Sequence, residues 1–292
     1  MDDATYFAAE AMSASGSKAM RRSPATFRFD RDHPRPPTPA MQAGSLVHAL
    51  ALTPASVRQA FSTGPDYSAV RTKDGKVPDN PAVTTEGKAL AKEWRAANPN
   101  VAVVAPDDWQ RAEAMAAAAL AAPIPAHMLA GGWTLADLLP AAKVELPIFW
   151  QDVVSGAQCK AKPDSVAQLP DLRVACVDLK TTSSDLTDAE LARTMATFGY
   201  HRQAAHYLEG LASQGVTDAE FWFLFVSTTA PHECAWKRVG HAALEVGARE
   251  MAAAKMVYAQ CIATGEWPTA QESGWLDGEL ELPRWYRGGE EG

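Results

Sequence analysis

Two short segments carry charged residues at spacings suited to metal-assisted chemistry. Asp178 and Lys180 are two residues apart, so on a β-strand both side chains point to the same face. Asp164 and Asp178 are symmetric about Asp171, which lies in the turn-like segment 168–172. In an antiparallel hairpin about that turn, the two aspartates would lie opposite one another, with Cβ atoms ~5 Å apart.

Two carboxylates at that separation repel each other unless a divalent cation lies between them. Oxygen ligands suit Mg²⁺ or Mn²⁺. The lysine beyond Asp178 can activate a water molecule or stabilise negative charge that develops on a phosphate. A D-x-K sequence alone is common in surface strands, so it is the preceding Pro163-Asp164, at hairpin-compatible spacing, that favours catalysis.

The segments around these residues are predicted to be β-strands. Apolar and polar residues alternate over 143–150 and again over 158–163, with a Ser-Gly turn signal between them. A third strand is predicted over 173–180. The run 220–227 is apolar on both faces, which is typical of a buried central strand.

Helices are predicted on both sides of these strands. The proline-rich segment 31–39 is expected to be an extended connector, and the polar segment 61–80 a long loop. From periodicity and boundary residues, the predicted helices are 41–52, 85–97, 107–121, 186–213 and 242–264, the last of which contains Gly247.

This order favours one α/β core with a helical N-terminal elaboration. We predict a single domain over residues 1–292. It comprises a mainly helical part (1–140), an α/β core that carries the charged residues (141–265) and an acidic C-terminal tail (266–292).

The composition is that of an ordinary globular protein, with 47% apolar and 21% charged residues, which excludes a disordered or collagen-like chain. No apolar run approaches the ~18 residues needed to cross a bilayer, and no signal peptide is recognised. We therefore expect a cytoplasmic protein without a membrane partner. The four cysteines form no C-x-x-C pair, so neither a zinc site nor an iron–sulfur cluster is expected.

The net charge of −8 by itself argues against nucleic-acid binding. The charge is unevenly distributed, however. Residues 266–292 hold seven acidic residues and two arginines, whereas residues 18–35 hold six basic residues and two acidic ones. A local basic face is therefore compatible with the composition.

Pro163-Asp164 followed by Asp178-Leu179-Lys180 resembles the motif of the PD-(D/E)XK nuclease superfamily. Further segments resemble the nuclease domain of the RecE-type exonuclease VIII, in the same order, from about residue 17 to residue 285. These segments are 41–48 (MQAGSLVH), 71–76 (RTKDGK), 149–150 (FW), 159–164 (CKAKPD), 177–182 (VDLKTT), 200–207 (YHRQAAHY), 267–268 (WP) and 282–285 (LPRW).

The resemblance implies a restriction-endonuclease-like α/β fold, with a central mixed β-sheet flanked by helices. It also implies two divalent ions, Mg²⁺ or Mn²⁺. Asp164, Asp178 and the backbone carbonyl of Leu179 match metal ligands of the family. His48 matches a histidine that helps bind a metal, and Lys180 matches the catalytic lysine.

Three further residues have two interpretations each. Gln203 and Tyr207 match the Q-x-x-x-Y motif of RecB-like nucleases and share one helix face, where they would position DNA or the attacking water. The alternative is a tyrosine packed on the sheet beside a glutamine. Glu145 is a candidate metal ligand on the first core strand or a surface glutamate.

Gly44, one turn before His48, would allow a close approach to that helix.

The remaining candidates could contact DNA. A basic loop, a basic N-terminal stretch and the threonines after the catalytic lysine are all suited to phosphate. The alternatives are a solvated loop, a solvated surface, and threonines that favour a strand or cap the next helix. These candidates are Arg21, Arg22, Arg71, Lys73, Lys76, Thr181 and Thr182.

The resemblance implies a metal-dependent exodeoxyribonuclease that digests linear double-stranded DNA from its ends, 5′-to-3′, in phage or prophage recombination. It also implies a ring-like homo-oligomer, a trimer or tetramer, and a RecT-like single-strand annealing partner. Two alternatives stay open. One is a structure-specific endonuclease or single-strand exonuclease on the same fold, and the other is a non-catalytic DNA-binding or DNA-mimicking protein.

Overall fold

The computed structural model describes residues 3–72 and 74–274. Its centre is a mixed five-stranded sheet with the strand order β3-β6-β7-β8-β9, in which only β7 and β8 pair in parallel. The strands are β3 (Lys143–Val144), β6 (Ser165–Gln168), β7 (Val174–Thr182), β8 (Ala219–Ser227) and β9 (Cys234–Arg238). Two small sheets accompany it, formed by β1 (Phe61–Ser62) with β2 (Ala102–Val103) and by β4 (Ile148–Gln151) with β5 (Gln158–Ala161).

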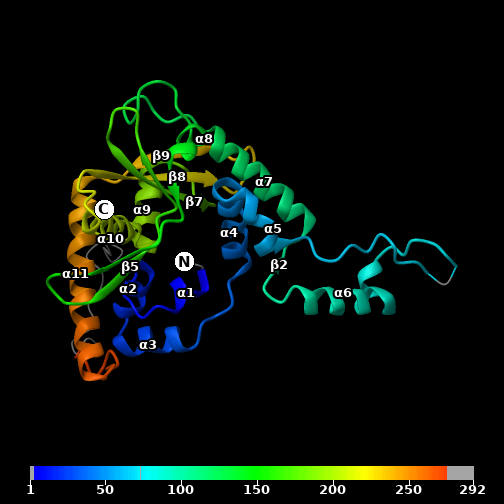
Figure 1. The fold of residues 1–292 in the computed structure, drawn as a ribbon, viewed down its shortest axis with the longest axis horizontal. Helices are drawn as coiled ribbons and strands as arrows, with labels where there is room; N and C mark the ends of the chain where they lie inside the picture. Colours follow the sequence, from blue (N-terminus) through cyan, green and yellow to red (C-terminus); the bar gives the residue numbers. More distant parts are fainter. Residues whose placement is uncertain (1–2, 73, 275–292) are drawn as a thin grey trace, which may run out of the picture.

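Helices cover both faces of the sheet (Figure 1). The α-helices are α1 (Asp3–Ala8), α2 (Ala14–Met20), α3 (Pro24–Asp32), α4 (Pro39–Leu52), α5 (Val57–Ala60), α6 (Thr85–Ala97), α7 (Pro106–Ala121), α8 (Leu135–Leu138), α9 (Asp188–Phe198), α10 (Tyr200–Ser213) and α11 (His241–Thr264). Short 3₁₀ turns occupy Pro54–Ser56, Pro81–Val83 and Leu139–Ala141. This arrangement confirms the predicted α/β class, with a central mixed sheet flanked by helices.

Successive side chains of β7 and β8 point to opposite faces of the sheet, and each face packs into its own apolar cluster. Val177 and Leu179 pack with Leu46 of α4 in one apolar cluster. Cys176, one residue out of phase, packs with Phe223 in the other cluster, which includes residues of α9, α10 and α11. Asp178 therefore points to the face of the sheet that α10 covers.

The hairpin predicted about residue 171 is present. β6 and β7 are antiparallel, with Ser165 opposite Val177 and Gln168 opposite Val174. Continuing this register by one residue places Asp164 opposite Asp178. The spacing of the two aspartates was therefore sufficient to predict their alignment.

The strand predicted over 143–150 is wrong as a single element. It is divided into β3 and β4, which belong to different sheets. Glu145 has a positive φ of 51° and Pro147 follows it, so neither residue continues a regular strand. The backbone leaves the main sheet here and enters the β4–β5 hairpin.

The helix predicted over 186–213 is also wrong as a single element. α9 ends and α10 begins at Gly199, whose left-handed φ of 76° turns the chain between them. The predicted strand over 158–163 ends at Ala161 and pairs with β4, beside the main sheet. Of the residues assigned to the acidic tail, 275–292 lie outside the described residues.

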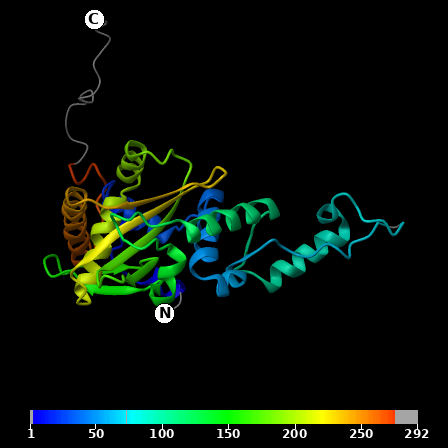
Figure 2. The ribbon, with the colours of Figure 1, turned by 90° about the horizontal axis from the view of Figure 1, so that it is seen from above.

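The segment between β1 and β2 forms an arm that extends away from the body and carries α6 (Figure 2). Its two ends meet, because Phe61 pairs with Ala102 and Ser62 with Val103. Most of the long loop predicted over 61–80 lies in this arm. Within the described part of the chain, none of the helices combines the length and hydropathy that a bilayer crossing requires.

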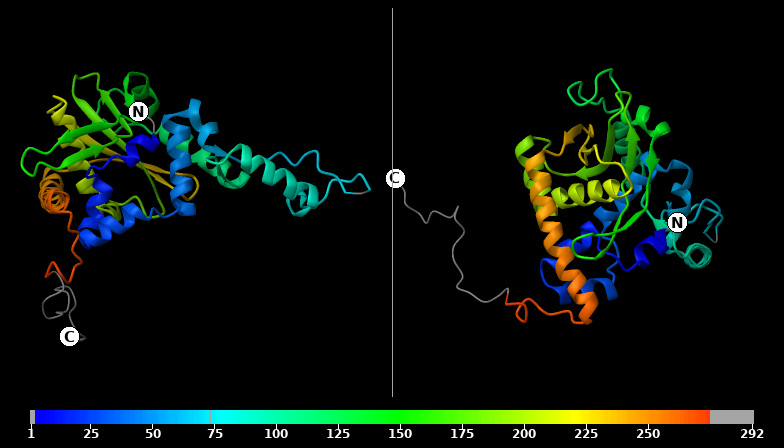
Figure 3. Two further views of the ribbon diagram at one scale, coloured as in Figure 1. Left: turned by 60° about the horizontal axis from the view of Figure 1, so that its bottom comes forward. Right: turned by 60° about the vertical axis from the view of Figure 1, so that its left-hand side comes forward.

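Helices α2 and α3 pack beside α11, whereas α1 lies farther from it (Figure 3). Met12 joins them to β5, since its N–H donates to the Gln158 carbonyl and its own carbonyl accepts from the Lys160 N–H, each at 2.8 Å. Arg21, the C-cap residue of α2, forms an ion pair with Glu250 of α11. The N-terminal segment is thereby attached to the core at separate places.

Gly247 has a packing role in α11. A Cβ atom at this position would lie 2.2 Å from the backbone oxygen of His201 in α10. We expect Gly247→Ala to lower the free energy of unfolding by ~1–3 kcal/mol, because the two helices would have to separate. If Gly247 were only a poor helix former, alanine would instead stabilise the protein by about 1 kcal/mol. Urea unfolding distinguishes the two signs.

Candidate active site

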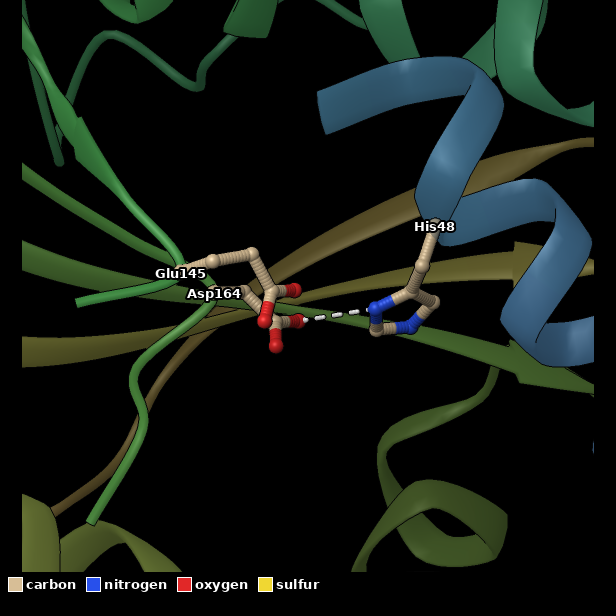
Figure 4. A group of neighbouring side chains, drawn as sticks. All are labelled: His48, Glu145 and Asp164. Atoms are coloured by element: carbon tan, nitrogen blue, oxygen red, sulfur yellow. Dashed lines mark ion pairs between the residues drawn. The ribbon is translucent and has the colours of Figure 1, made fainter. Parts of the chain in front are cut away.

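Three side chains from separate elements converge at one end of the hairpin (Figure 4). His48 belongs to α4, Glu145 follows β3 and Asp164 precedes β6. One potential ligand atom from each lies within 4.8 Å of the others, and His48 Nδ1 is 3.3 Å from Asp164 Oδ2. The structure thus brings together three of the residues that the sequence suggested as metal ligands.

Backbone contacts fix the two carboxylates of this cluster. The Leu179 N–H donates to Asp164 Oδ2 at 2.9 Å, and the Glu145 N–H donates to the Asp164 carbonyl at 3.0 Å. The left-handed backbone of Glu145 costs of order 1–3 kcal/mol, a strain typical of functional sites. The Glu145 side chain also pairs with Lys162 Nζ at 2.5 Å.

Helix α4 approaches the end of β7 closely. A Cβ atom at Gly44 would lie 3.3 Å from Thr181 Oγ1, which is a tight contact. Gly44 precedes His48 by one helical turn. A small residue at this position therefore lets His48 reach the carboxylates, in agreement with the sequence-based expectation.

Asp178 lies next to this cluster but has different partners. Its side chain is 1% exposed, forms an ion pair with Lys180 and accepts a hydrogen bond from Gln203 Nε2. Lys180 Nζ also lies 5.0 Å from the ring centre of Tyr200, at a cation–π distance. Residues from β7 and α10 thus form the second half of the site.

The electrostatics of the site favour a bound cation. Burial and the neighbouring Asp178 charge raise the pKa of Asp164 to about 6, although His48 and Lys180 oppose this. Burial lowers the pKa of Lys180, but Asp178 and Asp164 outweigh it and the net shift is upward. A divalent cation here would lower the cost of ionising the buried Asp164 beside Asp178.

The donor set fits a divalent metal. Two carboxylates and an imidazole nitrogen are ligands that Mg²⁺ and Mn²⁺ accept, and the imidazole favours Mn²⁺ of the two. Asp164, His48 and Glu145 are the residues placed to hold such an ion. The role of the Leu179 carbonyl as a ligand stays a prediction.

Tyr207 combines features of both sequence interpretations. Its ring packs edge-on against Phe221, with ring centres 6.1 Å apart, as the packing alternative proposed. Burial, and then the charges of Asp178 and Asp164, raise the pKa of Tyr207 well above its usual value. Its hydroxyl therefore stays protonated beside the acidic pair, while Gln203 contacts Asp178 directly.

The proposed DNA contacts lie in different places. Thr181 is beside Gly44, whereas Thr182 is buried and its Oγ1 accepts the Ser184 N–H at 3.0 Å in the turn after β7. Arg71 and Lys76 lie on the arm, Arg21 and Arg22 lie at the end of α2, and Lys73 lies outside the described residues.

A cavity of about 1690 Å³ opens onto the site. Its wall includes His48, Glu145, Lys180, Gln203 and Tyr207, together with residues of the N-terminal helices. Sequence reasoning did not identify the N-terminal helices as part of this wall, and it also missed Lys162 and Tyr200 as partners of Glu145 and Lys180. The position of Lys162, two residues before Asp164 in the motif, was an available signal.

A mixed sheet that presents a Pro-Asp and an Asp-x-Lys segment on paired strands defines a PD-(D/E)XK-type domain. The chain belongs to the family described as "PDDEXK-like domain of unknown function (DUF3799)", whose model matches residues 13–275. Fold and family together support a nuclease.

A solved structure agrees with this fold. A crystal structure described as a "Putative exonuclease" from Eubacterium rectale matches with a TM-score of 0.52 and 14% sequence identity, covering 94% of this chain and 90% of that one. A second structure, named SSO0001, has a TM-score of 0.28 and 15% identity, covering 40% of this chain and 50% of its own, too low a similarity for any argument. No curated protein matches the chain.

Proposed function

We propose that this protein is a divalent-metal-dependent nuclease that hydrolyses phosphodiester bonds of DNA. The observation that carries the proposal is the convergence of Asp164 and Asp178 with His48, Glu145 and Lys180. The last three of these residues line one cavity. Membership of a PDDEXK-like family supports the same reaction class.

The residues of the site have separate roles in this reaction. A divalent ion held by Asp164, His48 and Glu145 would supply positive charge for the phosphate and lower the pKa of a water molecule. Lys180, kept as an ammonium group by its ion pair with Asp178, stabilises negative charge on the phosphate in the transition state. Of the two roles suggested for this lysine, the ion pair favours charge stabilisation over proton abstraction.

Neighbouring side chains position this lysine. Gln203 holds one Asp178 oxygen by a hydrogen bond, and the ring of Tyr200 lies under the Lys180 ammonium group. Because Asp178 and Lys180 are nearly buried, few alternative rotamers are open to them. The charge is therefore preorganised before substrate arrives.

The finer proposal is an exonuclease that degrades linear double-stranded DNA, 5′-to-3′, in phage-type recombination. Its support is the resemblance of the spaced segments to RecE-type nucleases. The same resemblance supports a ring-like homo-oligomer and an annealing partner. Arg71 and Lys76 on the arm are proposed to grip DNA phosphates away from the site of cleavage.

One gel assay tests the proposal. Linear and covalently closed circular duplex DNA of the same sequence are incubated with the protein and Mg²⁺ or Mn²⁺, with and without EDTA. We expect nucleotides to be released from the linear DNA alone, and EDTA to abolish the release. Separate 5′ and 3′ end labels report polarity, since a 5′-to-3′ enzyme removes the 5′ label first.

The other outcomes identify the alternatives. Nicking or linearisation of the circular DNA would indicate an endonuclease, and degradation of single strands alone would indicate a single-strand exonuclease. Hydrolysis that is unaffected by EDTA would refute the metal-dependent mechanism. Intact DNA under all metal conditions would refute the nuclease.

A further inference from the structure

We infer that the cavity beside the active site binds an unpaired single strand of DNA, with bases stacked on Phe7 and Phe198. The inference deepens the proposed nuclease function and rests on it. The unpaired strand is the one to be cut, so a duplex end would have to open before its phosphates reach Lys180.

Exposed aromatic side chains carry the inference. Phe7 of α1 is 67% exposed and Phe198 of α9 is 53% exposed, yet both line the same cavity. Met41 of α4, 60% exposed, lines it from a third element. Large apolar side chains gathered in one hollow usually mark a binding surface.

The aromatic surface leads to the catalytic lysine. Phe198 stacks on Tyr200 with ring centres 5.6 Å apart, and Tyr200 in turn lies 5.0 Å from Lys180 Nζ. A base that stacks on Phe198 is therefore within a short distance of the phosphate-binding group. Stacking of this kind is available to any base and needs no sequence readout.

The charge of the cavity complements a nucleic-acid backbone. Among the described residues that line it are five lysines and arginines and two carboxylates. Lys18 Nζ lies 5.5 Å from the ring centre of Phe198, and Arg31 donates to the Ala8 and Ala9 carbonyls. In these contacts both cations face neutral groups, so their positive charge is not cancelled there.

The wall that carries Phe7 is held firmly. Lys160 Nζ donates to the carbonyls of Tyr6, Phe7 and Ala9 at 2.8, 3.0 and 2.9 Å. These bonds fix the end of α1 against β5. Because the backbone at Phe7 is held in place, only side-chain freedom is lost when a base stacks on its ring.

The occupant is a single strand, since the bases of a duplex are already stacked on one another and offer their faces only at an end. An unpaired strand exposes every base face to Phe7 and Phe198. If duplex DNA entered the cavity, its sugar-phosphate backbone, and not its base faces, would contact these rings. The combination of basic and aromatic groups is therefore matched to unpaired DNA.

The test measures binding in EDTA, where hydrolysis does not interfere. A single-stranded oligonucleotide containing 2-aminopurine, whose fluorescence falls when it stacks, is titrated with the full chain. We expect wild-type protein to bind it more tightly than the matching duplex and to quench its fluorescence. The double variant Phe7→Ala/Phe198→Ala should bind at least about tenfold more weakly, without quenching.

Phe29→Ala is the matched control. Phe29 is 57% exposed on α3 but is not among the residues that line the cavity, so its variant should bind and quench like wild type. Thermal melts check that all variants fold. Unchanged binding and quenching in the double variant, no binding of single strands by wild type, or preference for duplex would each overturn the inference.

The two proposals fail separately. Metal-dependent hydrolysis with no effect of the phenylalanine variants would refute the single-strand cavity and leave the nuclease intact. Phenylalanine-dependent quenching without hydrolysis under any metal condition would refute the nuclease and leave the cavity as a DNA-binding site.

Discussion

Asp178→Asn is expected to lower the rate of DNA hydrolysis by at least about 10³-fold, equivalent to several kcal/mol of transition-state stabilisation. The substitution keeps the shape of the side chain but removes its charge. Lys180 then loses its ion-pair partner, and Asp164 loses the second carboxylate of the site. Both halves of the proposed site depend on this residue.

The measurement is the initial rate of nucleotide release from end-labelled linear duplex at saturating Mg²⁺ or Mn²⁺. Asp171→Asn is the matched control, because Asp171 lies at the exposed tip of the same hairpin, where it pairs with Arg173. We expect this control to keep the wild-type rate. Asp178→Asn protein that retains the wild-type rate would contradict the proposed assignment of the site.

The alignment of the two aspartates could be predicted because it depends on local rules. β-Strands repeat every two residues, and a hairpin register follows from where the chain turns. The symmetry of Asp164 and Asp178 about Asp171 was therefore enough to place them opposite each other. The buried strand β8 was equally visible, since both of its faces are apolar.

The breaks in predicted elements depend on single backbone angles. Glu145 adopts a left-handed conformation that glutamate rarely takes, and tertiary contacts with Asp164 hold it there. Gly199 separates α9 from α10 within a continuous helical pattern. Periodicity is a property of many residues, so it does not reveal a reversal at one position.

The wall of the cavity could not be predicted for a different reason. Phe7 of α1 and Phe198 of α9 are separated by about two thirds of the chain, and no spacing rule relates them. Their proximity to one cavity arises from the attachment of Met12 to β5 and the bonds of Lys160. Such contacts become visible only when the chain is folded.

Lys255→Met is expected to lower the free energy of unfolding by ~3–5 kcal/mol, the range for a buried charge pair that loses one partner. Lys255 of α11 is 3% exposed. Its Nζ donates to Asp152 Oδ1 at 2.5 Å and to Glu209 at 2.6 and 2.8 Å. Methionine would fill the space but leave both carboxylates without their cation.

The stabilisation from the ion pair between Asp152 and Lys255 depends on pH. Burial raises the pKa of Asp152, but bonds from Lys255 and Ser155 outweigh it and hold the pKa well below its usual range. Because the folded pKa lies below the unfolded value of about 3.9, the stabilisation is complete above that value and is lost as the pH falls further. The difference in stability between wild type and Lys255→Met should therefore be largest near neutral pH and shrink in acid.

Urea unfolding at pH 7 and at more acidic pH measures both effects. Lys237→Met is the matched control, because Lys237 pairs with Asp188 at the surface, where water screens the ion pair and its loss should change stability little. If Lys255→Met and Lys237→Met have the same free energy of unfolding, the bonds from Lys255 to Asp152 and Glu209 do not hold α11 to the β4–β5 hairpin and α10. In that case the wall of the cavity formed by α1–α3, which α11 supports through Glu250 and Arg21, must depend on other contacts.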